Sequence, residues 1–138
     1  MDSNSSIDHI LSDRGILAPA QEAGWIACDL HGQSGWEYPV YDIDGQIVDY
    51  RWKNSDSSGR PKYRWLDQNN DRPKYYFLPG FQQAVEANNG VCYLASGEPD
   101  VLAFKAAGID NVFCWFGENS IPHTLVEDLE PLGVERLE

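Results

Sequence analysis

The chain has 138 residues, which fits one ordinary domain or one small domain with an N-terminal appendage. Its composition, 42% hydrophobic and 23% charged, is that of a globular protein, and no apolar run reaches the roughly 18 residues that a membrane span needs. The N-terminus lacks the basic start and apolar core of a signal peptide, so we expect a cytoplasmic protein with no membrane partner.

Cysteine usage agrees with that expectation. Cys28, Cys92 and Cys114 are widely separated, odd in number and set among apolar residues. This pattern favours reduced core cysteines over a disulfide framework or a zinc site.

The charge is unevenly distributed. The formal net charge is −12, yet seven of the ten basic residues lie between positions 51 and 74, where only three acidic residues occur. This window carries +4 and the remainder −16. A polyanion would therefore bind in this window.

The first 35 residues predict short helices and irregular chain. Apolar residues at 7, 10, 11 and 16 have near-helical spacing, and Gly15 can end that helix. A second helical turn is expected over 19–23, followed by irregular chain to residue 35.

Residues 38–78 predict a small antiparallel sheet. A hairpin over 38–52 contains Asp44-Gly45, the residue pair that a type I′ turn prefers because both central residues need positive φ. Short strands are expected over 62–66 and 74–78. The residues available for a buried face of the hairpin are Val40, Ile43, Ile47, Tyr50 and Trp52.

After Pro79-Gly80 the pattern becomes an alternation of helices and strands. Strand–helix–strand–helix–strand order predicts a parallel sheet. The expected elements are a helix over 81–87, a strand over 91–95, a helix over 100–107 capped by Gly108, a strand over 111–116, a helix from Ser120 to about Leu129, and a strand beginning over 134–137.

The predicted fold class is therefore α+β, with a small antiparallel β-rich module over about 36–78 followed by a parallel α/β half over about 90–138. The corresponding division into domains is 1–35, 36–80 and 81–138.

An acidic corner follows the strand over 91–95, in the run Ser96-Gly-Glu98-Pro-Asp100. Glu98 and Asp100 are candidates to hold a divalent ion or to orient a phosphate through one. Alternatively, both carboxylates favour the positive end of the helix dipole, by about 0.3–1 kcal/mol each.

The basic window interleaves cations with aromatic rings. Cations on phosphates and rings under bases are the combination that holds single-stranded nucleic acid. Alternatively, an antiparallel sheet packs its rings inward and exposes its cations, which gives the same pattern without a ligand. The candidate contacts are Arg51, Trp52, Lys53, Lys62, Arg64, Trp65 and Lys74.

Residues 36–138 resemble the Toprim region of phage- and plasmid-type primase/helicase proteins. In that family a hydrophobic strand ends in Glu-Gly, often followed by Glu-x-Asp-Ala-Leu and a helix ending in Ala-Gly. The matching residues are Ser96-Gly-Glu98-Pro-Asp100-Val-Leu, with Ala107-Gly108 at the helix end. A β-rich segment with an Asp-x-x-Gly hairpin precedes it in the family, as Asp42–Gly45 does here.

The resemblance implies DNA replication, single-stranded DNA as a partner, and primer synthesis by magnesium-dependent nucleotidyl transfer. It places Ser96 where the family has its catalytic glutamate, which leaves Glu98 as the nearest catalytic candidate and Glu98 with Asp100 as candidate metal ligands. The family's Asp-x-Asp metal site, which follows its third strand, is also missing from the sequence. A serine hydroxyl is a poor base or metal ligand, so we expect no polymerase activity from this chain.

Two other interpretations remain open. The chain is a non-catalytic module that binds single-stranded DNA or a replication partner such as a helicase, or it is a degenerate prophage remnant.

Overall fold

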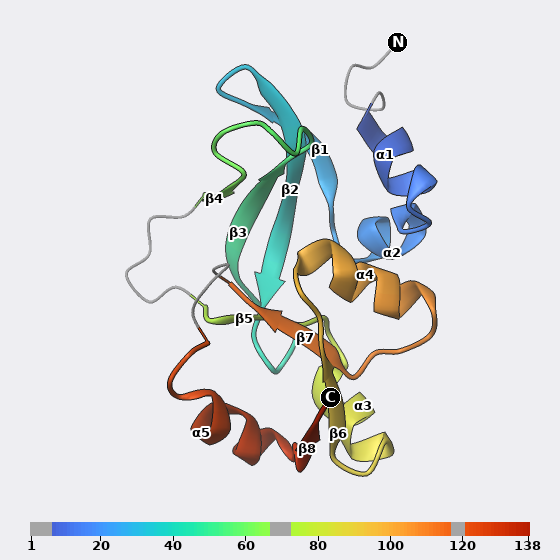
Figure 1. Ribbon diagram of the computed structural model, residues 1–138, viewed down its shortest axis with the longest axis vertical. Helices are drawn as coiled ribbons and strands as arrows, with labels where there is room; N and C mark the ends of the chain where they lie inside the picture. Colours follow the sequence, from blue (N-terminus) through green and yellow to red (C-terminus); the bar gives the residue numbers. More distant parts are fainter. Residues whose placement is uncertain (1–6, 67–72, 117–120) are drawn as a thin grey trace. The chain divides into compact units, whose positions relative to one another are not determined.

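The computed structural model describes residues 7–66, 73–116 and 121–138 (Figure 1). The chain divides into two compact units, the first within Met1–Val40 and Ile47–Arg72 and the second within Tyr41–Gln46 and Pro73–Glu138. An antiparallel sheet in the first unit and a sheet with parallel pairs in the second confirm the α+β class. No helix among these described ranges is long and apolar enough to cross a membrane.

The first unit joins two short helices to a four-stranded sheet in the order β1-β2-β3-β4. Its elements are α1 (Asp8–Asp13), α2 (Leu17–Glu22), β1 (Ile26–Leu30), β2 (Gln33–Tyr41), β3 (Ile47–Asn54) and β4 (Tyr63–Trp65).

Aromatic packing builds the core of the first unit. The Trp25 and Tyr38 rings stack with centroids 4.1 Å apart, and the Trp36 ring lies 6.2 Å from that of Trp25. The Trp36 indole Nε1 donates a hydrogen bond to Asp8 Oδ1 at 3.3 Å, which ties α1 to β2. All three rings are buried, so the core lies on the sheet face that these helices cover.

The expectation of irregular chain up to residue 35 is wrong. Residues 26–30 form β1, which pairs with the start of β2, and the two strands join through the two-residue loop His31-Gly32. Both loop residues have positive φ, 50° and 78°, as a type I′ hairpin requires. The sequence missed this hairpin because histidine is not a typical residue for the first position of that turn.

The loop between β2 and β3 is not the predicted type I′ turn, because Gly45 has positive φ and Asp44 does not. The Gly45 amide donates to the Asp42 carbonyl at 3.0 Å, and the Asp42 amide donates to the Gln46 carbonyl at 2.8 Å. A three-residue loop with glycine in the left-handed region has these bonds.

The second unit contains a four-stranded sheet in the order β5-β7-β6-β8, in which β6 runs parallel to both β7 and β8. The expected strand–helix alternation is confirmed. The elements are β5 (Tyr75–Tyr76), α3 (Phe81–Ala87), β6 (Val91–Leu94), α4 (Glu98–Ala106), β7 (Val112–Trp115), α5 (Leu125–Leu129), the 3-10 helix η2 (Glu130–Leu132) and β8 (Arg136–Leu137).

Two expectations for this unit need correction. The strand expected over 74–78 lies in the second sheet, where β5 pairs antiparallel with β7, and not in the first sheet. The helix expected from Ser120 begins only at Leu125, because residues 121–124 form a turn in which the Leu125 amide donates to the Pro122 carbonyl at 3.0 Å. Ser120 itself lies outside the described residues.

Helices cover both faces of the second sheet. Phe77, Phe81, Val85 and Leu129 pack around Phe113 of β7, which places α3 and α5 on one face. Tyr93 of β6 stacks on Phe104 of α4 with ring centroids 5.8 Å apart. Because Tyr93 pairs with Val112, the neighbour of Phe113, its side chain points to the opposite face, where α4 lies.

Candidate nucleic-acid interface

The acidic corner lies at the start of α4. Gly97 is the extended N-cap residue and makes no side-chain cap, and Pro99 occupies the first turn, where a missing amide costs no hydrogen bond. The Ser96 hydroxyl donates a hydrogen bond to Asp100 Oδ2. Glu98 is only 3% exposed. The corner therefore presents one carboxylate already bonded to serine and another that is buried.

This arrangement does not fit a magnesium ion. Magnesium needs several oxygen ligands around an accessible position. Among the described residues, no group of three or more His, Cys, Asp or Glu side chains could hold a metal ion. The assignment of Glu98 and Asp100 as metal ligands stays a prediction, and their place in the first turn of α4 fits the helix-dipole alternative.

The only Asp-x-Asp pair of the sequence serves the loop before β3. Asp42 Oδ1 accepts hydrogen bonds from the amides of Asp44 and Gln46, both at 2.9 Å. A side-chain oxygen that bonds to amides two and four residues ahead fixes a turn. The pair is therefore explained by loop structure.

The basic window is divided between the two units. Six of the seven predicted nucleic-acid contacts belong to the first unit, and Lys74 belongs to the second. There the Lys74 Nζ donates to Thr124 Oγ1 at 2.8 Å and lies 3.5 Å from Asp128 Oδ2. Lys74 thus helps to hold the chain before β5 against the start of α5.

In the first unit, the alternation of side chains separates Arg64 from the rings of β4. Arg51 pairs with Trp65, Trp52 with Arg64 and Lys53 with Tyr63. Because paired residues share a sheet face and neighbours alternate, Tyr63 and Trp65 lie with Arg51 on one face and Arg64 lies on the other. The cations and rings that alternate in the sequence are therefore distributed over the two faces of the β3–β4 ribbon.

On the first of these surfaces the cations are engaged with the rings. The Arg51 guanidinium carbon lies 4.6 Å from the centre of the Tyr63 ring and 4.8 Å from that of Trp65, and Arg51 is 7% exposed. Lys53 Nζ lies 5.5 Å from the Tyr63 ring and donates to the Asn54 carbonyl at 3.2 Å. Such cation–π contacts contribute about 0.5–2 kcal/mol each. Because Arg51 is buried against these rings, it is not accessible to a phosphate in this structure, and its role as a DNA contact stays a prediction.

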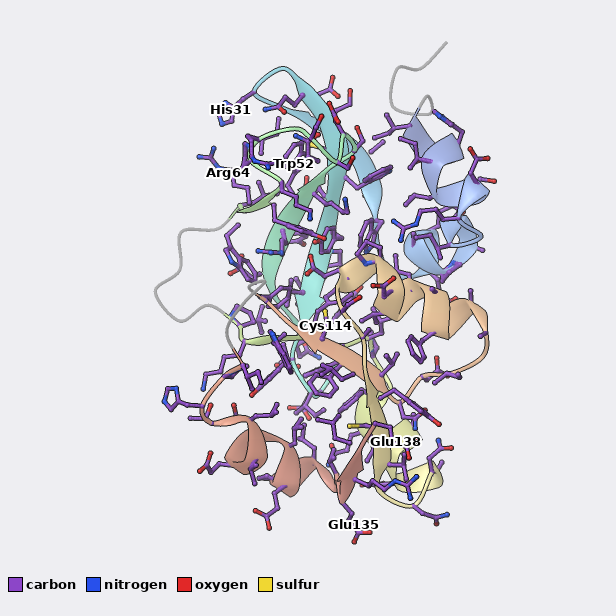
Figure 2. The ribbon with its side chains drawn as sticks, viewed as in Figure 1. His31, Trp52, Arg64, Cys114, Glu135 and Glu138 are labelled. Atoms are coloured by element: carbon purple, nitrogen blue, oxygen red, sulfur yellow. The ribbon has the colours of Figure 1, made fainter. Side chains whose placement is uncertain are left out.

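Trp52 is a core residue. Its side chain is 1% exposed, and its Nε1 donates to the Cys28 carbonyl at 2.9 Å (Figure 2). The ring lies against Gly35 of β2, where an added Cβ would stand 2.5 Å from two ring carbons. A ring so buried is not accessible to a base in this structure, and the role of Trp52 in base stacking stays a prediction.

The other face of the β3–β4 ribbon carries the buried Trp52 together with accessible side chains on either side of it. Lys62 and Arg64 are exposed, and Arg64 points away from the sheet in Figure 2. Tyr50 lies two residues before Trp52 on the same face and is 36% exposed, with Val48 at 42%. Sequence reasoning assigned Tyr50 and Ile47 to the buried face of the hairpin, and their exposure corrects that assignment. We call Tyr50, Lys62 and Arg64 the ribbon face.

A buried asparagine fixes the loop that leads into the ribbon face. Asn54, 1% exposed, donates from Nδ2 to Gln33 Oε1 at 2.6 Å and to the Pro61 carbonyl at 3.2 Å. Its Oδ1 accepts from the Asp56 amide at 3.0 Å. Satisfied buried amides of this kind specify one conformation. Nothing in the sequence marked Asn54, because asparagine between two strands is equally typical of an exposed turn.

The cysteines play no part in either candidate site. Cys92 and Cys114 are buried and Cys28 is partly buried, and none of the three forms a disulfide. Burial raises the pKa of the Cys92 thiol to about 11, and partial burial together with the Glu37 carboxylate raises the pKa of Cys28. Thiols with raised pKa are poor nucleophiles, in agreement with the prediction of reduced structural cysteines.

No protein-family model matches the chain, and no curated protein sequence matches it. Solved structures do match. A DnaG primase catalytic domain bound to single-stranded DNA aligns with a TM-score of 0.67 and 15% identity over 99% of this chain and 56% of its own. The RNA polymerase domain of Mycobacterium tuberculosis primase DnaG, in complex with a double-stranded DNA oligomer with a 6-nucleotide overhang, aligns with a TM-score of 0.72 and 13% identity over 96% and 54%.

The E. coli primase catalytic core aligns with a TM-score of 0.57 and 19% identity over 94% of this chain and 44% of its own. At these identities the likeness concerns the fold. The chain thus has a fold similar to that of DNA primase catalytic cores over nearly all of its length, and it spans about half of the solved chains that it matches.

Proposed function

We propose that the chain is a primase-like protein of DNA replication, of the phage or plasmid type, and that its own activity is to bind single-stranded DNA. The observation that carries the proposal is the fold match over 99% of the chain to a primase catalytic domain that was solved bound to single-stranded DNA. The concentration of basic residues in the first unit supports the same function.

The ribbon face is the proposed site of contact. Lys62 and Arg64 are exposed cations, and Tyr50, two residues before the Trp52 that pairs with Arg64, offers a ring as a platform for a base. Phosphate contacts provide affinity without sequence preference, and a stacked base adds about 1–3 kcal/mol. With a net charge of −12, the whole protein repels DNA outside this face, so we expect weak and strongly salt-dependent binding.

We further propose that the chain alone does not catalyse primer synthesis. By the sequence resemblance, Ser96 takes the family's glutamate position. Its hydroxyl is bonded to Asp100 and Glu98 is buried, which leaves this corner without an exposed pair of carboxylates for magnesium. If magnesium is used, Glu98 and Asp100 would need further ligands. DNA binding through the ribbon face requires none of them.

The test is fluorescence anisotropy with a labelled single strand of about 20 nucleotides over a salt series. The double variant Lys62→Ala/Arg64→Ala should bind at least about tenfold more weakly at low salt. The slope of log K against log salt should fall by about 1.4, since each lost contact to a single strand accounts for about 0.7.

The matched control removes two cations elsewhere, in Arg14→Ala/Lys105→Ala, and should keep the wild-type slope. An equal loss of DNA affinity in both double variants would mean that net charge, and not the ribbon face, determines binding. Absence of binding by the wild type at low salt would refute the proposal and favour a scaffold or a remnant.

A further inference from the structure

The three residues that precede β4 are held by their backbone carbonyls. The Arg60 carbonyl accepts a hydrogen bond from Gln33 Nε2 at 2.7 Å, and the Pro61 carbonyl accepts one from Asn54 Nδ2 at 3.2 Å. The Lys62 carbonyl accepts a third hydrogen bond, from the Asn54 backbone amide at 2.9 Å. Three consecutive carbonyls are thus bonded to residues of β2 and β3, which fixes the path of this backbone.

Gln33 joins this segment to the hairpin of β1 and β2. Its Oε1 accepts a hydrogen bond from Asn54 Nδ2 at 2.6 Å while its Nε2 donates to Arg60, so both ends of one side-chain amide are used. Asn54 is buried, and its Oδ1 accepts from the Asp56 amide at 3.0 Å. Hydrogen-bonded amides in series polarise one another, which strengthens each bond. The segment 60–62 is therefore held by a connected network that depends on Gln33.

The segment held in this way carries two exposed cations. Arg60 and Lys62 lie on either side of Pro61, and both side chains are exposed. Arg60 donates from Nη1 to the Gly59 carbonyl at 3.0 Å and was not among the contacts that the sequence predicted. Arg64 follows two residues later, also exposed. Cations on a backbone that is already ordered lose less freedom when a phosphate binds, and this raises affinity.

We propose that Arg60 is a further phosphate contact for single-stranded DNA and that Gln33 is a positioning residue, which holds the backbone of Arg60 and Lys62 ready for binding. This inference rests on the proposed function, because it adds residues to the same site. The group recognised is the sugar–phosphate backbone of a single strand, so neither Arg60 nor Gln33 should confer a base preference.

The test measures DNA binding of Arg60→Ala and Gln33→Met by fluorescence anisotropy over the same salt series. Arg60→Ala removes one phosphate contact, so the slope of log K against log salt should fall by about 0.7. Gln33→Met keeps every cation and removes both amide bonds to the loop. It should bind about fivefold more weakly, because the segment must then be ordered on binding, and it should keep the wild-type salt slope. A role of Gln33 in stability alone would lower the urea unfolding midpoint and leave the affinity of the folded protein unchanged.

A double-mutant cycle tests whether Gln33 acts through the two cations. In an Arg60→Ala/Lys62→Ala background, with Arg64 as the remaining exposed cation of β4, Gln33→Met should have no further effect on affinity at low salt. The matched control is Gln21→Met, at an exposed position of α2 in the first unit, which should bind as the wild type does.

Three results would overturn the inference and leave the proposed function intact. The first is wild-type affinity of Gln33→Met while Lys62→Ala/Arg64→Ala binds weakly. The second is a loss by Gln33→Met that persists in full without Arg60 and Lys62, and the third is an unchanged salt slope of Arg60→Ala. A wild-type protein that does not bind DNA even at low salt would instead refute both the inference and the proposed function.

Discussion

Replacement of Gly35 by alanine tests whether Trp52 belongs to the core of the first unit. An added Cβ at position 35 would stand 2.2 Å from the Lys53 carbonyl oxygen and 2.5 Å from two carbons of the Trp52 ring. The ring could turn away only by giving up its hydrogen bond to the Cys28 carbonyl, and the carbonyl of Lys53 is backbone within β3. The Gly35 backbone lies outside the positive-φ region, so the effect is steric overlap alone.

Overpacking of a buried site costs about 1–3 kcal/mol, and an overlap with backbone belongs at the upper end, about 3 kcal/mol. With a urea m-value of about 2 kcal/mol/M, the unfolding midpoint should fall by about 1.5 M. The assay is urea unfolding followed by tryptophan fluorescence. The native emission should also shift to longer wavelength, because Trp52 gains contact with water.

Gly97→Ala is the matched control, since Gly97 also has extended φ and the nearest atom to its added Cβ, in Pro99, lies 3.9 Å away. It should leave the midpoint within about 0.5 kcal/mol of the wild type. If Gly35→Ala were as stable as this control, the packing of Trp52 on β2 would be incorrect. Trp52 would then return as a candidate for base stacking.

Two further predictions concern polar networks. Gly59→Ala would place a Cβ 2.4 Å from the Asn54 Nδ2, so the loop would have to move away from the asparagine side chain. The free energy of unfolding, measured by thermal unfolding, should fall by about 1–3 kcal/mol. The hydroxyls of Tyr75 and Thr124 donate to Asp128 Oδ2, both at 2.7 Å, and hold the pKa of that carboxyl below its ordinary value of 3.8. This stabilisation is present above the ordinary pKa and is lost as the pH falls through the lowered value in the folded protein. Tyr75→Phe should therefore cost about 1 kcal/mol at pH 7 and clearly less near pH 2.5 in urea unfolding, and a cost that is the same at both pH values would contradict the assignment.

The fold was predictable where one strong local pattern decides an element. The apolar run from Val91, the following helix and the strand over Val112–Trp115 are found as expected, because a βαβ unit has few alternatives. The first hairpin is not predicted because His31 adopts positive φ, although histidine is not typical of such turn positions. The strand at Tyr75–Tyr76 was assigned to the wrong sheet, because two residues do not specify a partner.

The candidate sites, too, depend on features that a local sequence pattern does not determine. Composition located the basic window, but it could not tell which of its residues share a face. That depends on the register of β3 against β4, in which Trp52 is opposite Arg64. A slip of β4 by one residue would move Arg64 to the face of Arg51 and bring the rings of β4 to the face of Trp52, since a slip exchanges the two faces of a strand. Likewise, the hydrogen bond from Ser96 to Asp100 depends on where α4 begins.

The register also explains how one short ribbon serves both stability and a surface role. Arg51 is buried, so its charge needs a favourable contact. The Tyr63 and Trp65 rings provide cation–π contacts to it and thereby stabilise the first unit. The same alternation places Arg64 on the other face from these rings, and its side chain is exposed there, so its charge can remain hydrated. Loss of Arg64 should therefore affect ligand binding and leave folding unchanged, whereas loss of Arg51 should affect folding first. The sequence pattern of alternating cations and rings thus has two separable causes, and of Arg51 and Arg64 only the exposed Arg64 is accessible to the proposed DNA ligand.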